Sequence, residues 1–397
     1  MHIALLVLAI ATLAGCLAAG VEVTLGARRL VRLEDVPPVG QLVAPLISVV
    51  IPACNEERSI AGALRSVLAQ DYPRFEVIAI DDRSTDSTGA ILDSLAAADS
   101  RLRVIHISDL PAGWLGKNHA LQRGGESATG SLILFTDADV VMDASVLRRA
   151  AARMESNRLD HLAIAPLVEV GGFLSNAFLA VFAILFVLHT KPWKVGDPKS
   201  SHYIGIGAFN MVRATAWREA GGHRPIAMRP DDDVRLGKLM KMGGFRQDFV
   251  VGSKLLVVVW YHSFAEMRNG LMKNLFAGAD YRVPVIVAGC VFQIVFLVWP
   301  FVAVAITGGV VRGVNIAIVS VLLALFAANA GLPGIGRRWS LTLPIGALTG
   351  VYLMVRATAR TLIRGGIDWR GTHYRLDELR GQSNAATAAF PNGGDVR

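Results

Sequence analysis

Two aspartates, Asp137 and Asp139, follow a short apolar run at residues 131–135 and are separated by one small residue. Gly130 precedes the run, whose pattern is typical of a buried strand, so both carboxylates come at the strand's carboxyl end. Because side chains alternate along an extended chain, the two carboxylates can lie on one side. Such a pair suits Mg²⁺, which proteins hold with one or two carboxylates and the oxygens of a substrate diphosphate. The alternative is a pair of solvated turn aspartates.

Strands and helices alternate in the residues before this pair. Continuous apolar runs at residues 46–52 and 75–80 predict buried parallel strands, and residues 59–69 carry helical spacing between them. A third strand is predicted at residues 102–107. The alternation predicts an α/β fold with a doubly wound sheet, whose ligands bind beyond the carboxyl ends of the strands. The polar residues at these ends are Asn55, Glu56, Asp81, Asp82, Asp137 and Asp139.

The 397 residues are 53% hydrophobic with a mean hydropathy of +0.45, which is too apolar for an ordinary soluble protein. The stretches that lack Asp, Glu, Lys and Arg are residues 1–21, 283–311, 313–336 and 339–355. About 20 apolar residues span a bilayer, so the first three stretches are long enough and the fourth is marginal. We therefore predict a membrane anchor at residues 1–27, a polar domain at 44–270, membrane helices at 283–358, and a basic tail at 359–397 whose end is disordered.

The formal net charge of +8 fits a protein that lies on an anionic membrane leaflet and handles phosphates. Nucleic acid is set aside as a partner, because the sequence has no basic tract interleaved with aromatic residues and no recognisable nucleic-acid module. The three cysteines lie far apart, which indicates neither a disulfide framework nor a metal cluster. Nothing in the sequence predicts an oligomeric state.

Arginines flank the first and the last apolar stretches. Arg28, Arg29 and Arg32 follow the first one, so the positive-inside rule predicts a multi-pass protein of the cell membrane with a cytosolic polar domain. Residues 13–16 (LAGC) also resemble a lipoprotein processing box, which would instead export the domain. Six arginines between residues 356 and 380 favour a cytosolic tail, which requires two carboxyl-terminal crossings and a third stretch that is re-entrant or interfacial.

Four segments carry a more specific pattern: residues 47–56 (ISVVIPACNE), 77–86 (VIAIDDRSTD), 116–121 (GKNHAL) and 136–139 (TDAD). In this order and spacing they resemble the successive motifs of family 2 glycosyltransferases, which have the GT-A fold. The resemblance covers most of residues 45–142. It implies a glycosyltransferase whose GT-A domain is flanked by transmembrane helices.

The same resemblance implies roles for individual residues. The residues that would bind a nucleotide-sugar donor are Asn55, Glu56, Asp82, Lys117 and Asp137. The first three would face the nucleoside, and Lys117 would lie near the diphosphate, although a solvated loop lysine is the alternative there. Asp137 and Asp139 would flank a Mg²⁺ or Mn²⁺ that bridges the phosphates and helps the nucleoside diphosphate to leave.

Residues 231–233 are three adjacent aspartates, and they follow a segment at 204–213 that resembles the acceptor side of the family. The family usually has Glu-Asp ahead of a leucine here, and the aspartate is the general base. Counting back from Leu236 assigns the base to Asp233 and the glutamate position to Asp232. Adjacent carboxylates repel, which raises the proton affinity of at least one of them and suits a base. The alternative interpretation is that these aspartates stabilise the N-terminus of a helix. The two interpretations do not exclude each other.

An uncharged helix is predicted at residues 171–190. A membrane crossing there would separate the two halves of the polar domain. An interfacial helix that brings the site to a lipid acceptor is therefore favoured over a buried core helix. The tail segment at residues 368–374 (DWRGTHY) resembles a tail motif of the same enzymes, placed near the site.

The region after residue 260 departs from the processive members of the family, which carry a Gln-x-x-Arg-Trp signature there. Residues 260–274 instead resemble bacterial carotenoid and hopanoid-associated glycosyltransferases, which act on small lipids. The favoured interpretation is an inverting, metal-dependent glycosyltransferase that moves a sugar from a nucleotide sugar to a membrane lipid, with Asp233 as the base. Two alternatives stay open: a polyprenyl-phosphate sugar transferase, and a non-catalytic membrane scaffold that retains the fold.

Overall fold

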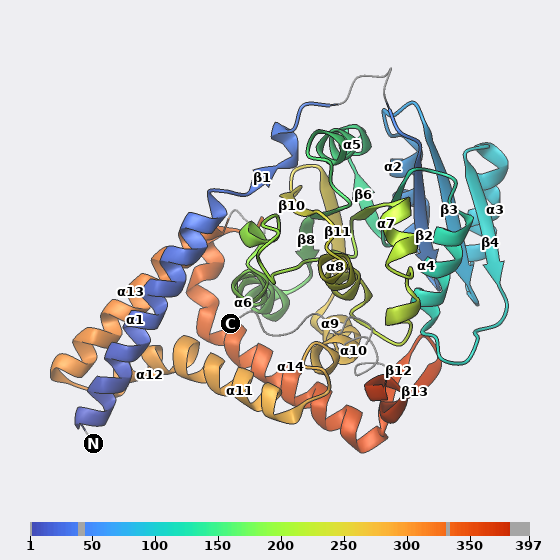
Figure 1. Ribbon diagram of the computed structural model, residues 1–397. Helices are drawn as coiled ribbons and strands as arrows, with labels where there is room; N and C mark the ends of the chain where they lie inside the picture. Colours follow the sequence, from blue (N-terminus) through green and yellow to red (C-terminus); the bar gives the residue numbers. More distant parts are fainter. Residues whose placement is uncertain (1, 39–43, 331–333, 382–397) are drawn as a thin grey trace. The chain divides into compact units, whose positions relative to one another are not determined.

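The computed structural model describes residues 2–38, 44–330 and 334–381. Contacts within the chain divide it into two compact units (Figure 1). The units are a sheet unit of Leu30–Val168, Lys194–Val259 and the chain from Asp368, and a helical unit of Met1–Arg29, Glu169–Trp193 and Trp260–Ile367. The disorder predicted for the end of the tail falls on residues outside the described ones.

The sheet unit is built on eight strands in the order β1-β10-β7-β9-β5-β2-β3-β4. β9 runs antiparallel to β5 and β7, and the other neighbouring pairs are parallel. The strands are β1 Val31–Arg32, β2 Ile47–Ala53, β3 Phe75–Asp82, β4 Leu102–Ile107, β5 Leu132–Phe135, β7 His161–Ala165, β9 Asn210–Arg213 and β10 Gln247–Val251. The predicted α/β fold class, with its largely parallel sheet, is confirmed.

Helices cover both faces of this sheet because successive strand side chains point to opposite faces. On β2, Val49 and Ile51 are buried in one core with Leu64, whereas Val50 is buried in a second core with Leu121. The helices of the first core are α2 Ile60–Leu68, α3 Thr88–Ala98 and α5 Val146–Ser156, and those of the second are α4 Gly116–Ser127, α7 Ala214–Glu219 and α8 Asp232–Met242. The two cores fix the strands, and therefore fix where each strand ends.

Two small sheets complete the strands. The first has the order β6-β11-β8 and consists of β6 Val140–Met142, β8 Leu167–Val170 and β11 Leu256–Tyr261. The second is a hairpin of β12 Gly366–Trp369 and β13 Thr372–Arg375 near the end of the described chain. β6 follows the strand end that carries Asp137 and Asp139, so its pairing with β11 helps to fix the chain after this pair.

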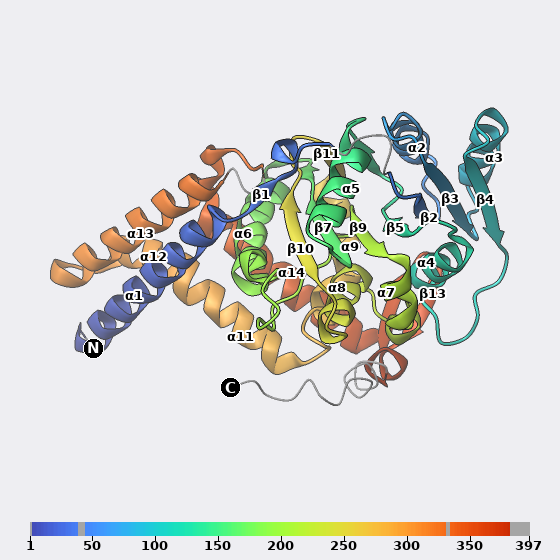
Figure 2. The ribbon, with the colours of Figure 1, turned by 45° about the horizontal axis from the view of Figure 1, so that its top comes forward.

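Among its described residues, the helical unit has five helices that are long and apolar enough to cross a membrane: Ile3–Ala27, Phe173–Lys194, Val283–Ile306, Gly309–Asn329 and Arg337–Arg364. Its helices are α1 His2–Ala27, α6 Phe173–Thr190, α9 Phe264–Gly270, α10 Met272–Ala277, α11 Val283–Gln293, α12 Trp299–Ile306, α13 Gly309–Asn329 and α14 Leu343–Arg364. α1 lies along α13, as Figures 1 and 2 show. Three of the five candidates follow residue 282, so the number of carboxyl-terminal crossings stays a prediction.

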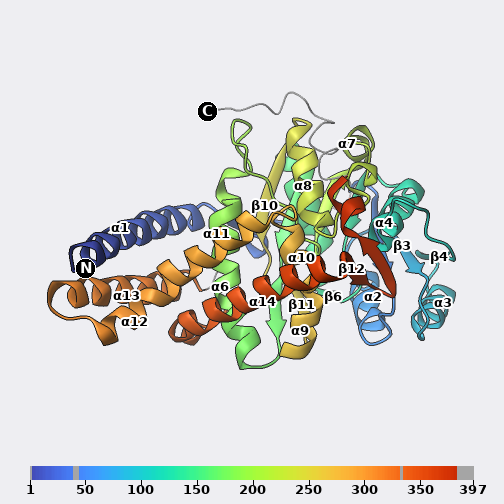
Figure 3. The same ribbon diagram turned by 90° about the horizontal axis from the view of Figure 1, so that it is seen from below.

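The helix expected at residues 171–190 is α6, which crosses α14 within the helical unit (Figure 3). Phe178 of α6 is buried together with Met267 and Leu353, and Phe182 packs against this cluster. Part of α6 therefore packs in a core of helices, as the interpretation of this segment as a buried core helix expects. The interfacial location of its remaining surface stays a prediction.

Candidate active site

Asp137 is held beside the backbone of residues 207 and 208, just beyond β5. Thr136 Oγ1 donates to the carbonyl oxygen of Ala208 at 2.7 Å, and the Asp137 N–H donates to that of Gly207 at 3.2 Å. A Cβ atom on Gly207 would lie 2.6 Å from Asp137 Oδ2, so this approach requires glycine. The chain turns at Ala138 and Asp139 instead of continuing as a strand, so strand alternation does not decide where the two carboxylates point.

Lys117 lies in the first turn of α4 and joins two of the predicted acidic residues. Its Nζ is 2.9 Å from Asp137 Oδ1 and 3.2 Å from Asp232 Oδ2. Burial alone lowers the pKa of a lysine, but the carboxylates of Asp137, Asp232 and Asp233 outweigh it and raise the pKa of Lys117 well above its ordinary value. Lys117 is therefore a fixed positive charge among carboxylates, which does not fit the alternative of a solvated loop lysine.

The first two of the three adjacent aspartates have different environments. Asp231 forms ion pairs with Arg229 and Arg235, each at 2.8 Å, which makes it a structural residue at the start of α8. Asp232 is only 4% exposed and contacts Lys117. Burial raises the pKa of Asp232 to about 7, although the charge of Lys117 opposes the rise.

Asp233 is less buried than Asp232 and is held by the glycine-containing segment at residues 204–208. Its Oδ2 accepts the N–H of Gly207 and its Oδ1 accepts the N–H of Val234, both at 2.8 Å. Burial raises the pKa of Asp233, and Lys117 and the two N–H groups oppose this rise. A Cβ atom on Gly205 would lie 1.8 Å from the backbone oxygen of Asp233, so the small residues of this segment bring it against α8.

Asp139 carries the least satisfied carboxylate of the cluster. Its Oδ1 is buried and has no hydrogen-bond partner among the described residues. Burial raises the pKa of Asp139 to about 7, and the charges of Asp137 and Glu56 add to the rise. A buried carboxylate oxygen without a partner is costly, and a bound cation would offset that cost. The residues present therefore fit a divalent cation.

Few carboxylates are available to a cation at this position. Over residues 2–38, 44–330 and 334–381, no group of three or more His, Cys, Asp or Glu side chains is arranged to hold a metal ion. Asp137 and Asp139 supply two carboxylates at most, whereas Mg²⁺ takes six oxygens and readily accepts those of a phosphate. Two carboxylates would leave coordination positions of such a cation open to other oxygens.

The three residues predicted to face the nucleoside lie at the carboxyl ends of two strands: Asn55 and Glu56 follow β2, and Asp82 is the last residue of β3. Asn55 Oδ1 accepts a backbone N–H at 2.8 Å from the loop after β3. Asp82 is 3% exposed and binds Arg83 through both of its oxygens, at 2.8 and 3.0 Å. Glu56 is ion-paired with Arg370. All three side chains already have partners within the protein, so a nucleotide has to share or displace these contacts.

Arg370 was not among the predicted site residues, although its tail segment at residues 368–374 was noted. Besides Glu56, its guanidinium contacts the backbone oxygens of Cys54 and Asn55. Nearby in the sequence, the hydroxyl of Tyr374 accepts the N–H of Gly116 at 3.4 Å. The pair of Arg370 and Glu56 is separated by 314 residues, so only the resemblance of the tail could have signalled the contact.

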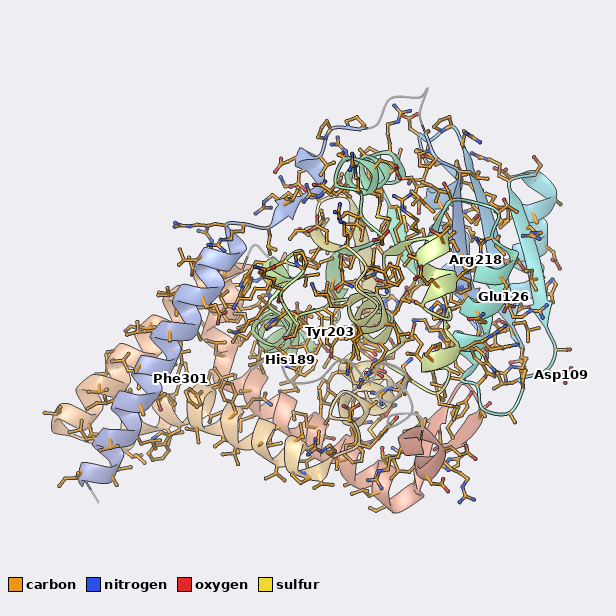
Figure 4. All side chains as sticks on the ribbon, in the orientation of Figure 1. Asp109, Glu126, His189, Tyr203, Arg218 and Phe301 are labelled. Carbon is orange, nitrogen blue, oxygen red and sulfur yellow. The ribbon has the colours of Figure 1, made fainter. Side chains whose placement is uncertain are left out.

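A small cavity lies among the cluster and is lined by Lys117, Asp137, Asp232 and Asp233. Its volume of about 10 Å³ is room for about one water molecule. A larger groove of about 260 Å³ between α4 and α7 includes Glu126 and Arg218 in its lining, and none of the predicted site residues (Figure 4). The small cavity has no room for a nucleotide sugar.

Comparison with known protein families identifies the domain that carries most of these residues. Residues 48–215 match the family Glycosyl transferase family 2. The chain carries a family 2 glycosyltransferase domain. The matched residues include the loops after β2, β3 and β5 and the glycines at 205 and 207, which confirms the predicted family 2 domain.

Two relatives are similar to much of this chain. The 4,4'-diaponeurosporenoate glycosyltransferase of Staphylococcus aureus (strain bovine RF122 / ET3-1) is 26% identical over 251 residues, which cover 62% of this chain and 64% of that protein. The match thus spans less than two thirds of that relative. The protein of the same name from strain USA300 is 23% identical over 348 residues, which cover 84% of this chain and 89% of the relative.

One solved structure shares the fold over most of its length. It is a mannosyltransferase from Pyrobaculum calidifontis, determined in complex with GDP-Man and Mn²⁺. It is 20% identical, with a TM-score of 0.52, and the match covers 90% of this chain and 99% of that one. The likeness shows the GT-A fold.

Proposed function

We propose that this glycosyltransferase moves a sugar from a nucleotide sugar to a membrane lipid in one inverting, metal-dependent displacement. The observation that carries the proposal is the cluster formed by Lys117, Asp137, Asp139 and Asp233 at the carboxyl edge of the sheet. It combines a fixed positive charge, a buried carboxylate oxygen without a described partner, and an aspartate that can accept a proton. Transfer from a diphosphate uses these three elements.

The donor side of the proposal concerns the diphosphate. Asp137 and Asp139 would hold Mg²⁺ or Mn²⁺, an ion that, when bound, neutralises charge developing on the departing nucleoside diphosphate. Lys117 is already fixed against Asp137 and would supply a second positive charge to the phosphates. The loops that carry Asn55 and Asp82 would hold the nucleoside. The Pyrobaculum mannosyltransferase, determined with GDP-Man and Mn²⁺, supports this assignment through the shared fold.

The acceptor side concerns the proton. The hydroxyl oxygen of the lipid would bond to the anomeric carbon as the bond from that carbon to the diphosphate oxygen breaks, and the hydroxyl proton would pass to Asp233. The burial that raises the pKa of Asp233 makes it a better base, and its exposure is greater than that of Asp232. Asp232 takes this role if the alignment to the family motif is one residue off.

The lipid acceptor is supported by two observations. Five helices are candidates for crossing a membrane, and the Staphylococcus aureus relatives carry the name of a glycosyltransferase for 4,4'-diaponeurosporenoate. A domain held at the cytosolic face of the cell membrane, with α6 at the interface, would meet a water-soluble donor and a membrane acceptor together. The charge of +8 is consistent with an anionic leaflet.

One observation favours the second candidate, a polyprenyl-phosphate sugar transferase. Both oxygens of Asp233 already accept backbone N–H groups, and hydrogen bonds to a carboxylate weaken it as a base. A phosphate acceptor is ionised at neutral pH and needs less help from a base. The two candidates therefore differ in how much transfer depends on Asp233.

A screen of nucleotide sugars tests the proposal. The protein is purified in detergent and incubated with individual nucleotide sugars, a lipid extract and Mn²⁺ or Mg²⁺, and the lipids are analysed by mass spectrometry. One donor should be consumed with the appearance of a glycosylated lipid, and a chelator should stop the reaction. If no donor is transferred or hydrolysed under any of these conditions, the scaffold alternative is correct instead.

A further inference from the structure

The hairpin of β12 and β13 has an arginine where its turn favours other residues. Its two connecting residues, Arg370 and Gly371, have φ values of 50° and 78°. Two-residue hairpin turns with positive φ at both positions are of the I′ type, which favours Asn-Gly and Gly-Gly. A side chain as large as arginine is strained at positive φ, so the turn itself does not explain Arg370.

The contacts of the Arg370 guanidinium supply the explanation. One of its nitrogens donates to the backbone oxygens of Cys54 and Asn55, and the other pairs with the carboxylate of Glu56. The loop that it contacts contains a left-handed residue, Asn55, with a φ of 56°, a conformation that asparagine tolerates. A charge-assisted, forked contact from Arg370 therefore offsets the strain of its own turn position and holds this loop.

A second contact ties the same hairpin to the start of α4. Tyr374 is 6% exposed, and its hydroxyl accepts the N–H of Gly116 at 3.4 Å. Gly116 precedes Lys117 directly, and a Cβ atom on Gly116 would lie 2.2 Å from Asp82 Oδ2. The hairpin therefore contacts the loop after β2 and the helix start that carries Lys117.

We propose that Arg370 is a positioning residue of the donor site, which holds the loop of Cys54, Asn55 and Glu56 in the conformation that receives the nucleotide. The inference rests on the proposed function, because it takes this loop as part of the nucleotide-sugar site. It also makes the tail part of the site, although the family match ends at residue 215. In the sequence, this tail follows α14 through Gly365.

The chemistry of the contact predicts which kinetic constant changes. Arg370 touches the donor loop and none of the residues that would move the proton or hold the cation. It should therefore support binding of the donor equally in the ground state and in the transition state, which changes KM and leaves kcat unaltered. A general structural defect would instead lower the melting temperature and every activity together.

The test compares two arginines of one hairpin. Arg370→Ala removes the contact with the donor loop, whereas Arg375→Ala is the matched control, since Arg375 is 68% exposed and pairs with Asp377 at 2.7 Å. Binding of UDP and of GDP with Mn²⁺ is measured by calorimetry, and KM, kcat and melting temperature are measured beside it. Arg370→Ala should weaken binding of the preferred nucleotide and raise KM about tenfold, with kcat and melting temperature close to those of Arg375→Ala. Arg370→Lys, which keeps the charge and loses the fork, should lie between Ala and wild type.

The thiol of Cys54 reports on the same loop without any nucleotide. Cys54 is half-buried, whereas Cys16 and Cys290 are buried. If Arg370 orders the loop, alkylation of Cys54 by a maleimide should be several-fold faster in Arg370→Ala than in wild type or Arg375→Ala. Mass spectrometry of the labelled peptides measures the three rates.

Two results overturn the inference: equal nucleotide affinity and equal alkylation in the two alanine variants, or tighter nucleotide binding by Arg370→Ala, which would make the arginine a competitor for the site. Failure of the proposed function is distinguishable from both. If the wild-type protein binds neither UDP nor GDP and the screen finds no donor that is transferred or hydrolysed, the proposed function fails, and the alkylation rates alone decide whether Arg370 orders this loop.

Discussion

Two groups of carboxylates at the same edge of the sheet differ in how the protein satisfies them. At the end of β3, Asp81 accepts the N–H of Ser84 at 3.2 Å and contacts His106 at 2.9 Å, and Asp82 binds Arg83 through both oxygens. Around α4, by contrast, a single lysine, Lys117, forms ion pairs with two carboxylates, those of Asp137 and Asp232. In that second group, Asp139 has a buried oxygen without a partner in the described part of the chain.

The difference separates carboxylates that hold loops from carboxylates available for chemistry. A buried charge is tolerated when its partners are built into the fold, as they are for Asp82. In the second group burial and neighbouring charges raise the pKa of Asp139 and Asp232 to about 7, which means that the protein alone does not stabilise their ionised forms. Ligands that bring positive charge would stabilise the ionised forms. Carboxylates whose pKa values are shifted in this way are typical of functional sites.

The largest expected effect comes from Asp233 in the second group. Asp233→Asn keeps the size of the side chain and cannot accept the proton of an acceptor hydroxyl, and general-base assistance supplies about 10² to 10⁴ in rate. We expect kcat for lipid glycosylation to fall by this factor while the affinity for the nucleotide barely changes. Turnover with the donor identified by the screen, measured beside binding of its nucleoside diphosphate, checks this.

Asp232→Asn is the matched variant for that experiment. It removes the carboxylate that contacts Lys117, so it should alter the position of the lysine more than the proton transfer. A large loss of kcat in Asp232→Asn with little loss in Asp233→Asn would move the base by one residue. Little loss in either would favour a phosphate acceptor.

A smaller effect is expected from the proposed metal ligand. Asp139→Ala removes one of two carboxylates, and the binding of a nucleoside diphosphate should lose most of its enhancement by Mn²⁺, about tenfold or more, while metal-free binding is retained. Titration calorimetry with Mn²⁺ and with EDTA measures both. Asp109→Asn, an exposed surface change (Figure 4), is the control, and equal metal enhancement in Asp139→Ala and in this control would remove Asp139 from the metal site.

The fold was predictable where apolar runs and turn residues repeat along the chain. The strand predicted at residues 102–107 is β4 Leu102–Ile107, and the run at 46–52 corresponds to β2 Ile47–Ala53. The antiparallel strand β9 was not predicted, because its four residues become a strand only by pairing with β5 and β7. Short strands carry little local signal, and distant partners decide them.

The candidate site was predictable in its members and less so in its geometry. The order of the motifs predicted that Lys117 and Asp137 belong to the same donor site, and their side chains are 2.9 Å apart. Packing against other segments determines the turn at Asp139 and the different partners of Asp231 and Asp232. Neighbouring residues in the sequence do not reveal such packing. The contact of Arg370 with Glu56 also depends on packing, since the two residues are 314 positions apart in the sequence.

The smallest expected effect is a change of stability that depends on pH. In the ordinary unfolded chain an aspartate has a pKa of about 3.9, whereas burial, with the charges of Asp137 and Glu56, raises the pKa of Asp139 to about 7 in the folded protein. Between about pH 4 and pH 7 the folded protein therefore binds a proton that the unfolded chain has lost. The stability that this proton contributes is fully present below about pH 4 and is lost as the pH rises through about 7.

Asp139→Asn removes that dependence because an amide does not ionise. With EDTA present, we expect the variant to melt close to wild type at pH 5 and above it at pH 8, by about 2–4 °C if solvent screening leaves about 1 kcal/mol of the effect. Asp82→Asn should do the opposite at pH 8, since Arg83 loses its bidentate partner and the melting temperature falls. Melting temperatures of detergent-solubilised protein across this pH range measure both. A difference between Asp139→Asn and wild type that is the same at pH 5 and pH 8 would mean that Asp139 titrates as an ordinary surface aspartate, and the contrast between the two groups of carboxylates would then rest on Asp232 alone.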